Sequence, residues 1–520
     1  MTQSTQPQNT CFEKSELTSN SIESALDTMQ SAKDVEQAFF LLYQWLLSES
    51  SLQASAYEVE QQLFQGGMEL LRRMLEQNFA SRGKGDVALA LLEKAEGGQE
   101  VRLGERNEHT RQYESRFGTI RILRLGYKKT QTSSIHPLDE ELNLPKRKYS
   151  YVLQEQATKQ CSRGPYEEVR ETIKETTAAN FPKRQLEEVA IDGAQDFDAF
   201  YEQRERKVKP PEETGLILVA GVDRTGVPKR KSEEEKEEDA AKKGQRLKAG
   251  EKRTKKKMAM VASVHTTQPF VRTPEQVVSR LMDKHELAVE QKRPEAEERR
   301  LWASLLNSKD EVIKDVVEEM KRRDPTGEKI ATCLMDGERA LRTGAEKHIL
   351  KEFPGLILIL DIIHVIEYLW KAVYAFFTVG SEEAYNWVRA KLLLLLRGGV
   401  SRVVAGMKQS ATKRRLSKKK RKAVDKACKY FMKNKDRMRY NEYLKQGLPI
   451  ASGSVEGACG HLVKDRMART GASWDVQGAG AEAILRLRAI DKSGDFAEYW
   501  QFHMQQEKER NYNRDWIPES

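Results

Sequence analysis

Three widely separated acidic residues stand where a carboxylate can do chemistry. Asp223 and Asp336 each follow an apolar, strand-like run, and Glu456 opens a helix-like segment after a Gly/Ser-rich loop. The separations are 336 − 223 = 113 and 456 − 336 = 120 residues. Carboxylates gathered at one point repel one another unless cations lie between them, and their hard oxygen atoms suit Mg²⁺ or Mn²⁺. Two such ions roughly 4 Å apart can activate a nucleophile and stabilise a leaving oxygen in phosphoryl transfer.

The spacing alone leaves a simpler interpretation open. An aspartate at the end of a strand is commonly a turn former or a helix cap. Only a fold that brings the three carboxylates together makes them a site, so the elements around them decide the question.

The elements around Asp336 are the clearest in the chain. Residues 330–369 alternate short apolar runs with helix-length segments, and Pro354-Gly355 breaks them in the middle. This pattern predicts strand, helix, strand and helix, as in a parallel βαβ unit. Sites in open α/β sheets lie at the carboxyl ends of the strands. Asp336 and Asp361 both stand at such ends, with His364 one turn beyond Asp361.

The neighbouring segments extend this α/β region. Residues 214–225 predict a buried strand that ends on Asp223, and residues 258–265 predict a second strand, antiparallel to the first. The dense Lys/Glu tract of residues 229–257 predicts a flexible loop. A charged helical region and a long, purely helical region are predicted at residues 274–323 and 366–444.

The N-terminal part of the chain is mostly helical in pattern. Residues 1–32 are rich in Ser, Thr, Gln and Asn, which predicts disorder, and the apolar spacing of residues 34–81 predicts a helical hairpin or a small bundle. Alternation in residues 118–126 predicts a small β element. Three short helices are then predicted at residues 149–161, 166–176 and 183–191. Their spacing suits a helix-turn-helix module, and a generic three-helix bundle is the alternative.

The positive charge of the chain is concentrated in one block. The net charge is +10, and residues 407–440 carry fifteen Lys or Arg against two Asp, a local balance of 15 − 2 = +13. The remainder is therefore close to 10 − 13 = −3. Such a block favours an anionic partner, nucleic acid first, and a solvated helix face is the alternative.

Cysteine usage and hydropathy point to a cytoplasmic location without membrane association. The five cysteines are scattered and contain no CxxC pair, which is typical of a reducing compartment. Cys459 and His461 lie close together, but two ligands do not make a zinc site. The longest apolar runs are far shorter than a membrane span.

Four motifs follow one another in order along the chain. They are Asp223-Arg-Thr-Gly-Val-Pro, Asp336-Gly-Glu-Arg-Ala, Asp361-Ile-Ile-His364, and the region from Gly447 through Ser-Val-Glu456-Gly to Trp474. In these residues the chain resembles bacterial insertion-sequence transposases of the DDE type, specifically the ISKra group, which is distantly similar to Mutator-like transposases. The resemblance spans roughly residues 55 to 500. The Lys/Glu tract is longer and more charged than the family pattern.

The resemblance implies an α/β fold with an RNase H-like catalytic core, in which Asp223, Asp336 and Glu456 meet at one edge of the sheet. It also implies a helical insertion and a mostly helical N-terminal DNA-binding region. The expected division is a disordered N-terminus (1–32), a helical region (33–100), a small β element (101–137), a helix-turn-helix-like DNA-binding module (138–205), the first part of the core (206–365, with the loop 229–257), the helical insertion with the basic block (366–446) and the C-terminal helices of the core (447–510).

The function implied by the resemblance is metal-dependent DNA transposition. Asp223, Asp336 and Glu456 would be the catalytic residues and would hold two Mg²⁺ or Mn²⁺ ions. Strand cleavage at the terminal inverted repeats of an insertion sequence would free a 3′-hydroxyl, which would then attack target DNA. Pairing two element ends requires a homodimer or a higher oligomer, and the expected location is the cytoplasm, on the nucleoid DNA.

Further residues are expected to contact DNA. His364 shares a helix turn with Asp361, and Trp474 follows a Gly-rich turn from which it could stack on an unpaired base; core packing is the alternative for both. Phosphate contacts are expected from Lys464, Arg466, Lys418, Lys419, Lys420 and Arg421, and a solvated face is the alternative. The aromatic residues Tyr430, Phe431 and Tyr440 are interleaved with the basic block along the expected DNA path.

Two other functions fit the same sequence. A structure-selective DNA nuclease on the same core needs the three carboxylates but no end-specific DNA module. A catalytically inactive, transposase-derived DNA-binding protein needs the module alone. The presence of all three acidic residues argues against the second of these.

Overall fold

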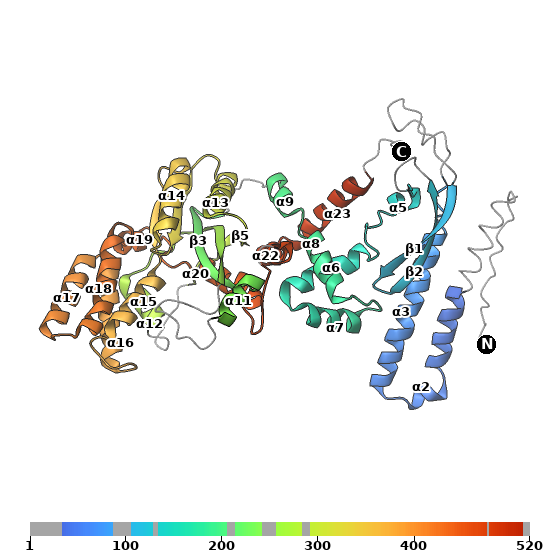
Figure 1. The fold of residues 1–520 in the computed structure, drawn as a ribbon, viewed down its shortest axis with the longest axis horizontal. Coiled ribbons are helices and arrows are strands. Elements are labelled where there is room, and N and C mark those ends of the chain that lie inside the picture. The colour runs from blue at the N-terminus through green and yellow to red at the C-terminus, as the bar shows by residue number, and fades with distance from the viewer. Residues whose placement is uncertain are drawn as a thin grey trace, which may run out of the picture. The chain divides into compact units, whose positions relative to one another are not determined.

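The computed structural model describes residues 34–86, 106–127, 134–204, 214–241, 256–282, 292–475 and 478–512. They belong to two compact units (Figure 1). Unit 1 comprises residues 1–157, 167–185 and 504–520, and unit 2 comprises residues 158–166 and 186–503. The predicted disorder of residues 1–32 lies outside the described residues, and the expected module at 138–205 is divided between the two units.

Unit 1 is built on a β-hairpin and a long helix (Figure 1). Strands β1 (Arg106–Ser115) and β2 (Gly118–Tyr127) pair antiparallel, and helix α3 (Ala56–Ala80) packs against β2. Ser55 starts α3, because its side chain and that of Glu58 form a reciprocal capping box. Leu75 and Phe79 of α3 pack on a small buried core of Ile120, Ile122, Leu138 and Leu144. The other described helices with residues in this unit are 34–46, α2 (Glu49–Gln53), α5 (Pro137–Glu141), α6 (Tyr151–Arg163), α7 (Tyr166–Thr176), the start of α8 (Lys183–Asp192) and the end of α23 (Phe496–Tyr512).

Unit 2 contains a mixed five-stranded sheet. The spatial order is β5 (Glu297–Ser304), β4 (Lys256–Thr267), β3 (Ile217–Pro228), β6 (Ile330–Met335) and β7 (Ile357–Leu360). Strands β3, β6 and β7 are parallel, whereas β4 pairs antiparallel with both β3 and β5. The apolar runs of the three parallel strands are largely buried, as expected for a sheet covered on both faces.

Helices connect and cover these strands. Between the strands lie α11 (Glu233–Ala241), α12 (Pro274–Met282), α13 (Lys309–Arg323) and α14 (Arg339–Glu352). Later in the chain than the last strand come α20 (Gly453–Ala458), a π-helical segment (Cys459–Lys464), α21 (Asp465–Met467), α22 (Ala479–Ser493) and α23 (Phe496–Tyr512). Before the first strand of the sheet lie α8 (Lys183–Asp192) and α9 (Phe197–Gln203). Of these, α22 lies alongside the edge strand β5.

A purely helical segment separates β7 from α20, as the periodicity of residues 366–444 predicts. It comprises α15 (Ile362–Val373), α16 (Glu382–Leu396), α17 (Val400–Lys413), α18 (Lys418–Lys433) and α19 (Tyr440–Lys445). Leu369, Leu392, Met407 and Phe431, one from each of the first four helices, are fully buried in a core that continues into β7. The segment is therefore packed onto the sheet through a shared hydrophobic core.

Several sequence predictions match these elements. The strand–helix–strand–helix order predicted for residues 330–369 is confirmed as β6, α14, β7 and α15. The antiparallel pairing predicted for the strands at residues 214–225 and 258–265 is confirmed as that of β3 with β4. The mixed α/β class is the one observed.

Three details of the sequence interpretation are wrong. Residues 274–323 are not helical throughout, because they contain β5. The tract 229–257 is not only a loop, because α11 lies within it. Strand β3 does not end on Asp223 but continues to Pro228, since its pairing with β4 extends that far. No helix among the described residues combines the length and the apolar character needed to cross a membrane.

Candidate metal centre

Three aspartates stand level with one another on adjacent parallel strands. Val222 of β3 is in register with Met335 of β6, and Met335 is in register with Leu360 of β7. The next residue in the chain is an aspartate in each case: Asp223 lies within β3, and Asp336 and Asp361 directly follow the ends of β6 and β7. The parallel pairing ends at this level, so the three side chains lie at the carboxyl edge of the sheet, where sites form in α/β folds.

Glu456 reaches the same edge from helix α20. This helix packs on β3, where the backbone of Gly221 lies so close that a Cβ there would stand 3.1 Å from the side chain of Val455. The loop before α20 is fixed to the start of α15, because the Ile362 N–H donates to the Ile450 carbonyl at 3.0 Å. Segments about a hundred residues apart in sequence are therefore joined at one point.

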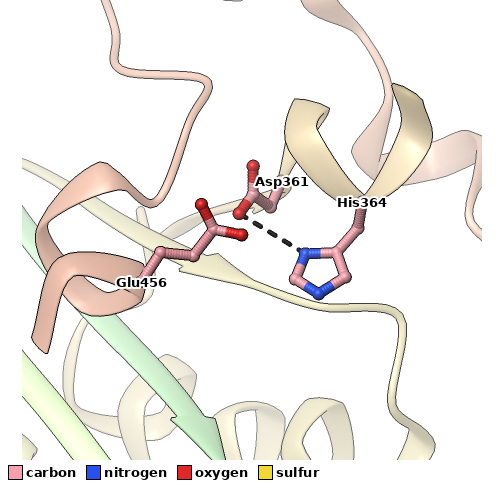
Figure 2. Close-up of side chains that lie close together, drawn as sticks. All are labelled: Asp361, His364 and Glu456. Atoms are coloured by element: carbon pink, nitrogen blue, oxygen red, sulfur yellow. Dashed lines mark ion pairs between the residues drawn. The ribbon is translucent and has the colours of Figure 1, made fainter. Parts of the chain in front are cut away.

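The tightest group in this region is Asp361, His364 and Glu456 (Figure 2). Each of the three offers a ligand atom, and these atoms all lie within 4.8 Å of one another. Figure 2 shows the Glu456 carboxylate directed from its helix toward the other two side chains. Carboxylate oxygens and an imidazole nitrogen at such separations are suited to hold a divalent cation.

Asp361 is held in place by several contacts. Its side chain is completely buried and caps helix α15 by accepting the Ile363 N–H at 2.8 Å. The Ser452 hydroxyl donates to its other oxygen, which also lies 3.5 Å from Nδ1 of His364. Both interpretations of a strand-end aspartate therefore apply to Asp361. It is a helix cap, and it belongs to the set of Asp223, Asp336, Asp361 and Glu456, which we call the acidic group.

The carboxylates of the group repel one another. Burial raises the pKa of Asp336, and the charge of Asp223 raises it further. Burial likewise raises the pKa of Glu456, with added contributions from Asp361 and Asp223. Asp223 accepts a hydrogen bond from the Cys459 thiol at 3.4 Å, and burial together with this carboxylate raises the pKa of that thiol. A divalent cation between these oxygens would remove the repulsion, so the donor set fits such an ion.

His364 is the positive charge nearest this group. The carboxylate of Asp361, 3.5 Å from Nδ1, raises the pKa of His364 to about 9 from the usual 6.5; burial opposes this shift, and the charges of Asp223 and Asp336 support it. The histidine is therefore protonated at neutral pH when no cation is bound.

We expect the stabilising effect of His364 to depend on pH. Because its pKa is raised in the folded state, its contribution is fully present below pH 6.5 and is lost as the pH rises through about 9. Unfolding by urea in chelator should show His364→Gln less stable than wild type by about 1 kcal/mol at pH 6, allowing for partial exposure. The difference should approach zero near pH 10. An equal difference at both pH values would contradict this assignment.

Trp474 and Arg466 contact each other near the end of the fourth motif. The Arg466 guanidinium lies 4.8 Å from the centre of the Trp474 ring, and its Nε donates to the Cys161 carbonyl at 3.2 Å. Arg466 is only 4% exposed, and the Trp474 indole N–H donates to the Met467 carbonyl at 2.9 Å. These contacts favour packing roles for both residues over the expected contacts with DNA.

The basic block lies mostly on one helix. Lys418, Lys419 and Lys420 begin α18 and are exposed, and Arg421 is half-buried, with its Nη1 3.3 Å from the Thr412 hydroxyl. Lys464 is also exposed. For Phe431 and Tyr440 the expected place along the DNA path is wrong, because both are fully buried; Tyr430 is half-buried. The Tyr440 hydroxyl donates to the Leu360 carbonyl at 2.8 Å.

Cys459 and His461, which lie close together in the sequence, do not share a metal site in the structure. Cys459 contacts Asp223, whereas His461 is exposed and its Nδ1 lies 3.1 Å from Asp465. Asp361 and Ser452 also belong to the site, although they were not among its predicted residues. The position of Asp361 at a strand end was visible in the sequence, but its contact with Ser452, 91 residues away, was not.

Comparison with known proteins identifies no family. No known protein family matches the chain, and no curated protein matches it. Among solved structures, the "Drosophila P element transposase strand transfer complex" is similar over 67% of this chain and 80% of that chain, with 8% sequence identity and a TM-score of 0.23. A TM-score of this size does not establish a shared fold, so the function below rests on the geometry of this chain.

Proposed function

We propose that this protein is a metal-dependent DNA transposase of the DDE type, related to the ISKra group. The observation that carries the proposal is the register of the sheet. It sets Asp223, Asp336 and Asp361 level on three parallel strands, and α20 adds Glu456. The motifs that suggest the family in the sequence are the same residues that meet at this edge.

The topology of the sheet supports an RNase H-like core. If the strands β3 to β7 are numbered 1 to 5 in chain order, their spatial order in the sheet is 3-2-1-4-5. Only the second of them, β4, is antiparallel to the others. This is the strand order of the RNase H-like fold. The helical segment from α15 to α19 then corresponds to the insertion expected before the third carboxylate.

The acidic residues take separate roles in this proposal. Asp223, Asp336 and Glu456 hold the divalent cations, Mg²⁺ or Mn²⁺, with Asp361 beside them. Two ions held there would stabilise the attacking and leaving oxygens of an in-line phosphoryl transfer. Asp361 also positions His364 through the 3.5 Å contact with Nδ1. The imidazole is then positioned to contact a phosphate oxygen of the DNA strand.

The exposed lysines at the start of α18 offer a path for the DNA backbone. Helix α18 turns Val424, Ala427, Cys428 and Phe431 inward, so its lysines face solvent. Tyr430 of the same helix packs against Gly337, next to Asp336, because a Cβ on that glycine would stand 2.3 Å from the tyrosine ring. The basic helix and the acidic group are therefore neighbours within unit 2.

Replacing Lys418, Lys419 and Lys420 with Gln should weaken DNA binding and change its salt dependence. Each phosphate contact that is lost reduces the slope of log K against log salt concentration by about 0.9. The triple variant should therefore show a slope about 3 units shallower, measured by fluorescence anisotropy between 50 and 300 mM salt, a range chosen to span the steep region. Lys314→Gln, an exposed lysine on α13, is the control. An unchanged slope in the triple variant would exclude α18 from the interface.

Recognition of the element ends is assigned to the N-terminal helices and the helix-turn-helix-like module, and action on two ends to a homodimer or a higher oligomer. The helices from residue 34 to Ala80 carry many exposed apolar side chains, among them Phe39, Phe40, Leu47, Leu52 and Tyr57. Apolar surface of this kind is typical of association sites. Sedimentation equilibrium at micromolar concentration should give at least a dimer, and a monomer would contradict this part of the proposal.

The function is tested by strand cleavage on DNA from both edges of the native locus, with Mg²⁺ or Mn²⁺. The proposal predicts nicking at one defined position at each end and, with target DNA present, joined products. Cleavage that follows DNA structure and ignores the end sequence would replace the transposase with a structure-selective nuclease. Specific binding to the ends without cleavage would favour a non-catalytic DNA-binding protein.

A further inference from the structure

A separate cavity of about 230 Å³ is lined in part by the loop that precedes Glu456. It is lined by the end of β4, the segment after β4, the residues leading into β5, and the loop 447–453. His265 marks its position on the sheet, because it pairs with Val219, four residues before Asp223 on β3. At about 3.3 Å per residue this is roughly 13 Å from the acidic edge.

Three arginines line the cavity: Arg272, Arg293 and Arg299. No Asp or Glu is among the lining residues, and within the part of the chain that the structure describes none of the three forms an ion pair with a carboxylate. Burial and the neighbouring Arg293 and Arg280 lower the pKa of Arg272 to about 10. Among the described residues, the cavity thus gathers positive charge without a carboxylate in its lining.

Arg272 is built into the wall. Its Nη2 donates to the Leu448 carbonyl at 2.5 Å and its Nε to the Phe270 carbonyl at 3.0 Å. The Phe270 N–H donates to the Gly447 carbonyl at 2.9 Å, so the segment after β4 is tied to the loop before α20. Arg293 and Arg299 are exposed, which leaves the cavity open to solute.

A buried histidine without a partner also faces this space. His265 is 8% exposed, and its Nδ1 has no hydrogen-bond partner among the described residues. Burial and the charges of Arg323, Arg299 and Arg293 lower its pKa to about 3, so the ring is neutral. A neutral imidazole can donate one N–H, and leaving such a buried group unpaired is costly.

We propose that this cavity is a phosphate-binding site, in which Arg272, Arg293, Arg299 and the N–H of His265 contact the phosphate oxygens. Arginine forks match phosphate geometry, and charge-assisted hydrogen bonds of this kind are the strong ones. The space is ample, since one water needs only about 15 Å³ by the same measure. The phosphate belongs either to a DNA backbone or to a free nucleotide. The proposal does not rest on the function assigned to the acidic group.

Binding at this cavity would act on the loop that carries part of the acidic group. Gly447, Pro449 and Gly453 line the cavity, and Ser452 between them donates to Asp361. An adjoining small cavity is lined by His265 and Arg293 on one side and by Ser452 and Val455 on the other. A bound phosphate would therefore hold the loop that places Glu456.

Isothermal titration calorimetry with inorganic phosphate, in chloride buffer of matched ionic strength, tests the site. Wild type should bind saturably with one site per chain, and the variant Arg293→Gln/Arg299→Gln should bind at least about tenfold more weakly. Both residues are exposed, so the variant should keep the thermal midpoint of wild type. Lys292→Gln, an exposed neighbour outside the cavity lining, is the matched control and should bind as wild type does.

Two further titrations identify the source of the phosphate. Competition of bound phosphate by a short DNA duplex in wild type would assign the site to a backbone phosphate, and tighter binding of a nucleoside diphosphate than of duplex would assign it to a nucleotide. Either result supports the site if the double variant loses it. Absence of saturable binding for all three ligands, or equal binding by wild type and the double variant, would overturn it. Strand cleavage by the acidic group is a separate readout.

Discussion

Asp336→Asn should abolish strand cleavage while the protein still binds DNA. The change keeps the size of the side chain and removes its negative charge, so the cations lose a charged ligand at the centre of three adjacent strands. Charge stabilisation in phosphoryl transfer is the largest catalytic contribution that such a site makes. We expect cleavage to fall at least about 10³-fold, equivalent to about 4 kcal/mol of barrier. Asp223→Asn should behave in the same way, since it occupies the equivalent position on β3.

The control for this experiment is Asp310→Asn. Asp310 is an exposed aspartate in the first turn of α13 that pairs with Lys347 at 3.4 Å, away from the acidic group. Its loss should leave cleavage within about twofold of wild type, because an exposed ion pair contributes little. Anisotropy on the same DNA should give equal affinities for all the variants. Full cleavage by Asp336→Asn would remove this residue from the catalytic group.

Glu319→Ala should destabilise unit 2 more than other single changes away from the acidic group. Glu319 is completely buried on α13, and its two oxygens lie 2.7 Å from Nη1 of Arg300 and 2.7 Å from Nε of Arg323. Removing one member of a buried ionic cluster leaves charges unpaired inside the protein and typically costs about 3–5 kcal/mol. The two arginines are themselves buried. Urea unfolding followed by circular dichroism should show this loss.

Glu318→Ala provides the matched control one residue away. Glu318 is exposed and lies only 3.7 Å from Lys321 in its own helix. This change should cost less than about 0.5 kcal/mol, as is usual for surface positions. If the two variants lose the same stability, the buried cluster does not fix β5 to α13.

The same buried ionic cluster explains why the sequence did not predict strand β5. The segment Glu297–Ser304 begins with four charged residues inside a charged, helix-like region, so its pattern did not predict a strand. The structure buries Arg300 in the strand by pairing it with Glu319 and by placing its guanidinium 3.7 Å from the centre of the Tyr201 ring. A local pattern cannot show a partner that arrives from another element. The central strands, by contrast, are buried on both faces and carry their signal in their own apolar runs.

The candidate site, like the sheet, could be predicted from the sequence only in part. Each of Asp223, Asp336 and Asp361 was visible in the sequence as the polar end of an apolar run. Their common level was not visible, because it depends on the register between strands that lie far apart in the chain. The packing of Phe431, Tyr440 and Arg466 was also hidden, since the spacing of these residues fits a basic surface equally well. The arginine-lined cavity is assembled from four separate segments and has no linear signature.

The central claim is that the acidic group holds divalent cations, and electron paramagnetic resonance with Mn²⁺ tests it most directly. We expect wild type to bind two Mn²⁺ ions per chain and to show the spin coupling of a pair about 4 Å apart. The double variant Asp336→Asn/Glu456→Gln should lose this coupled signal, while Asp310→Asn should keep it. Equal Mn²⁺ binding by wild type and the double variant would contradict the account.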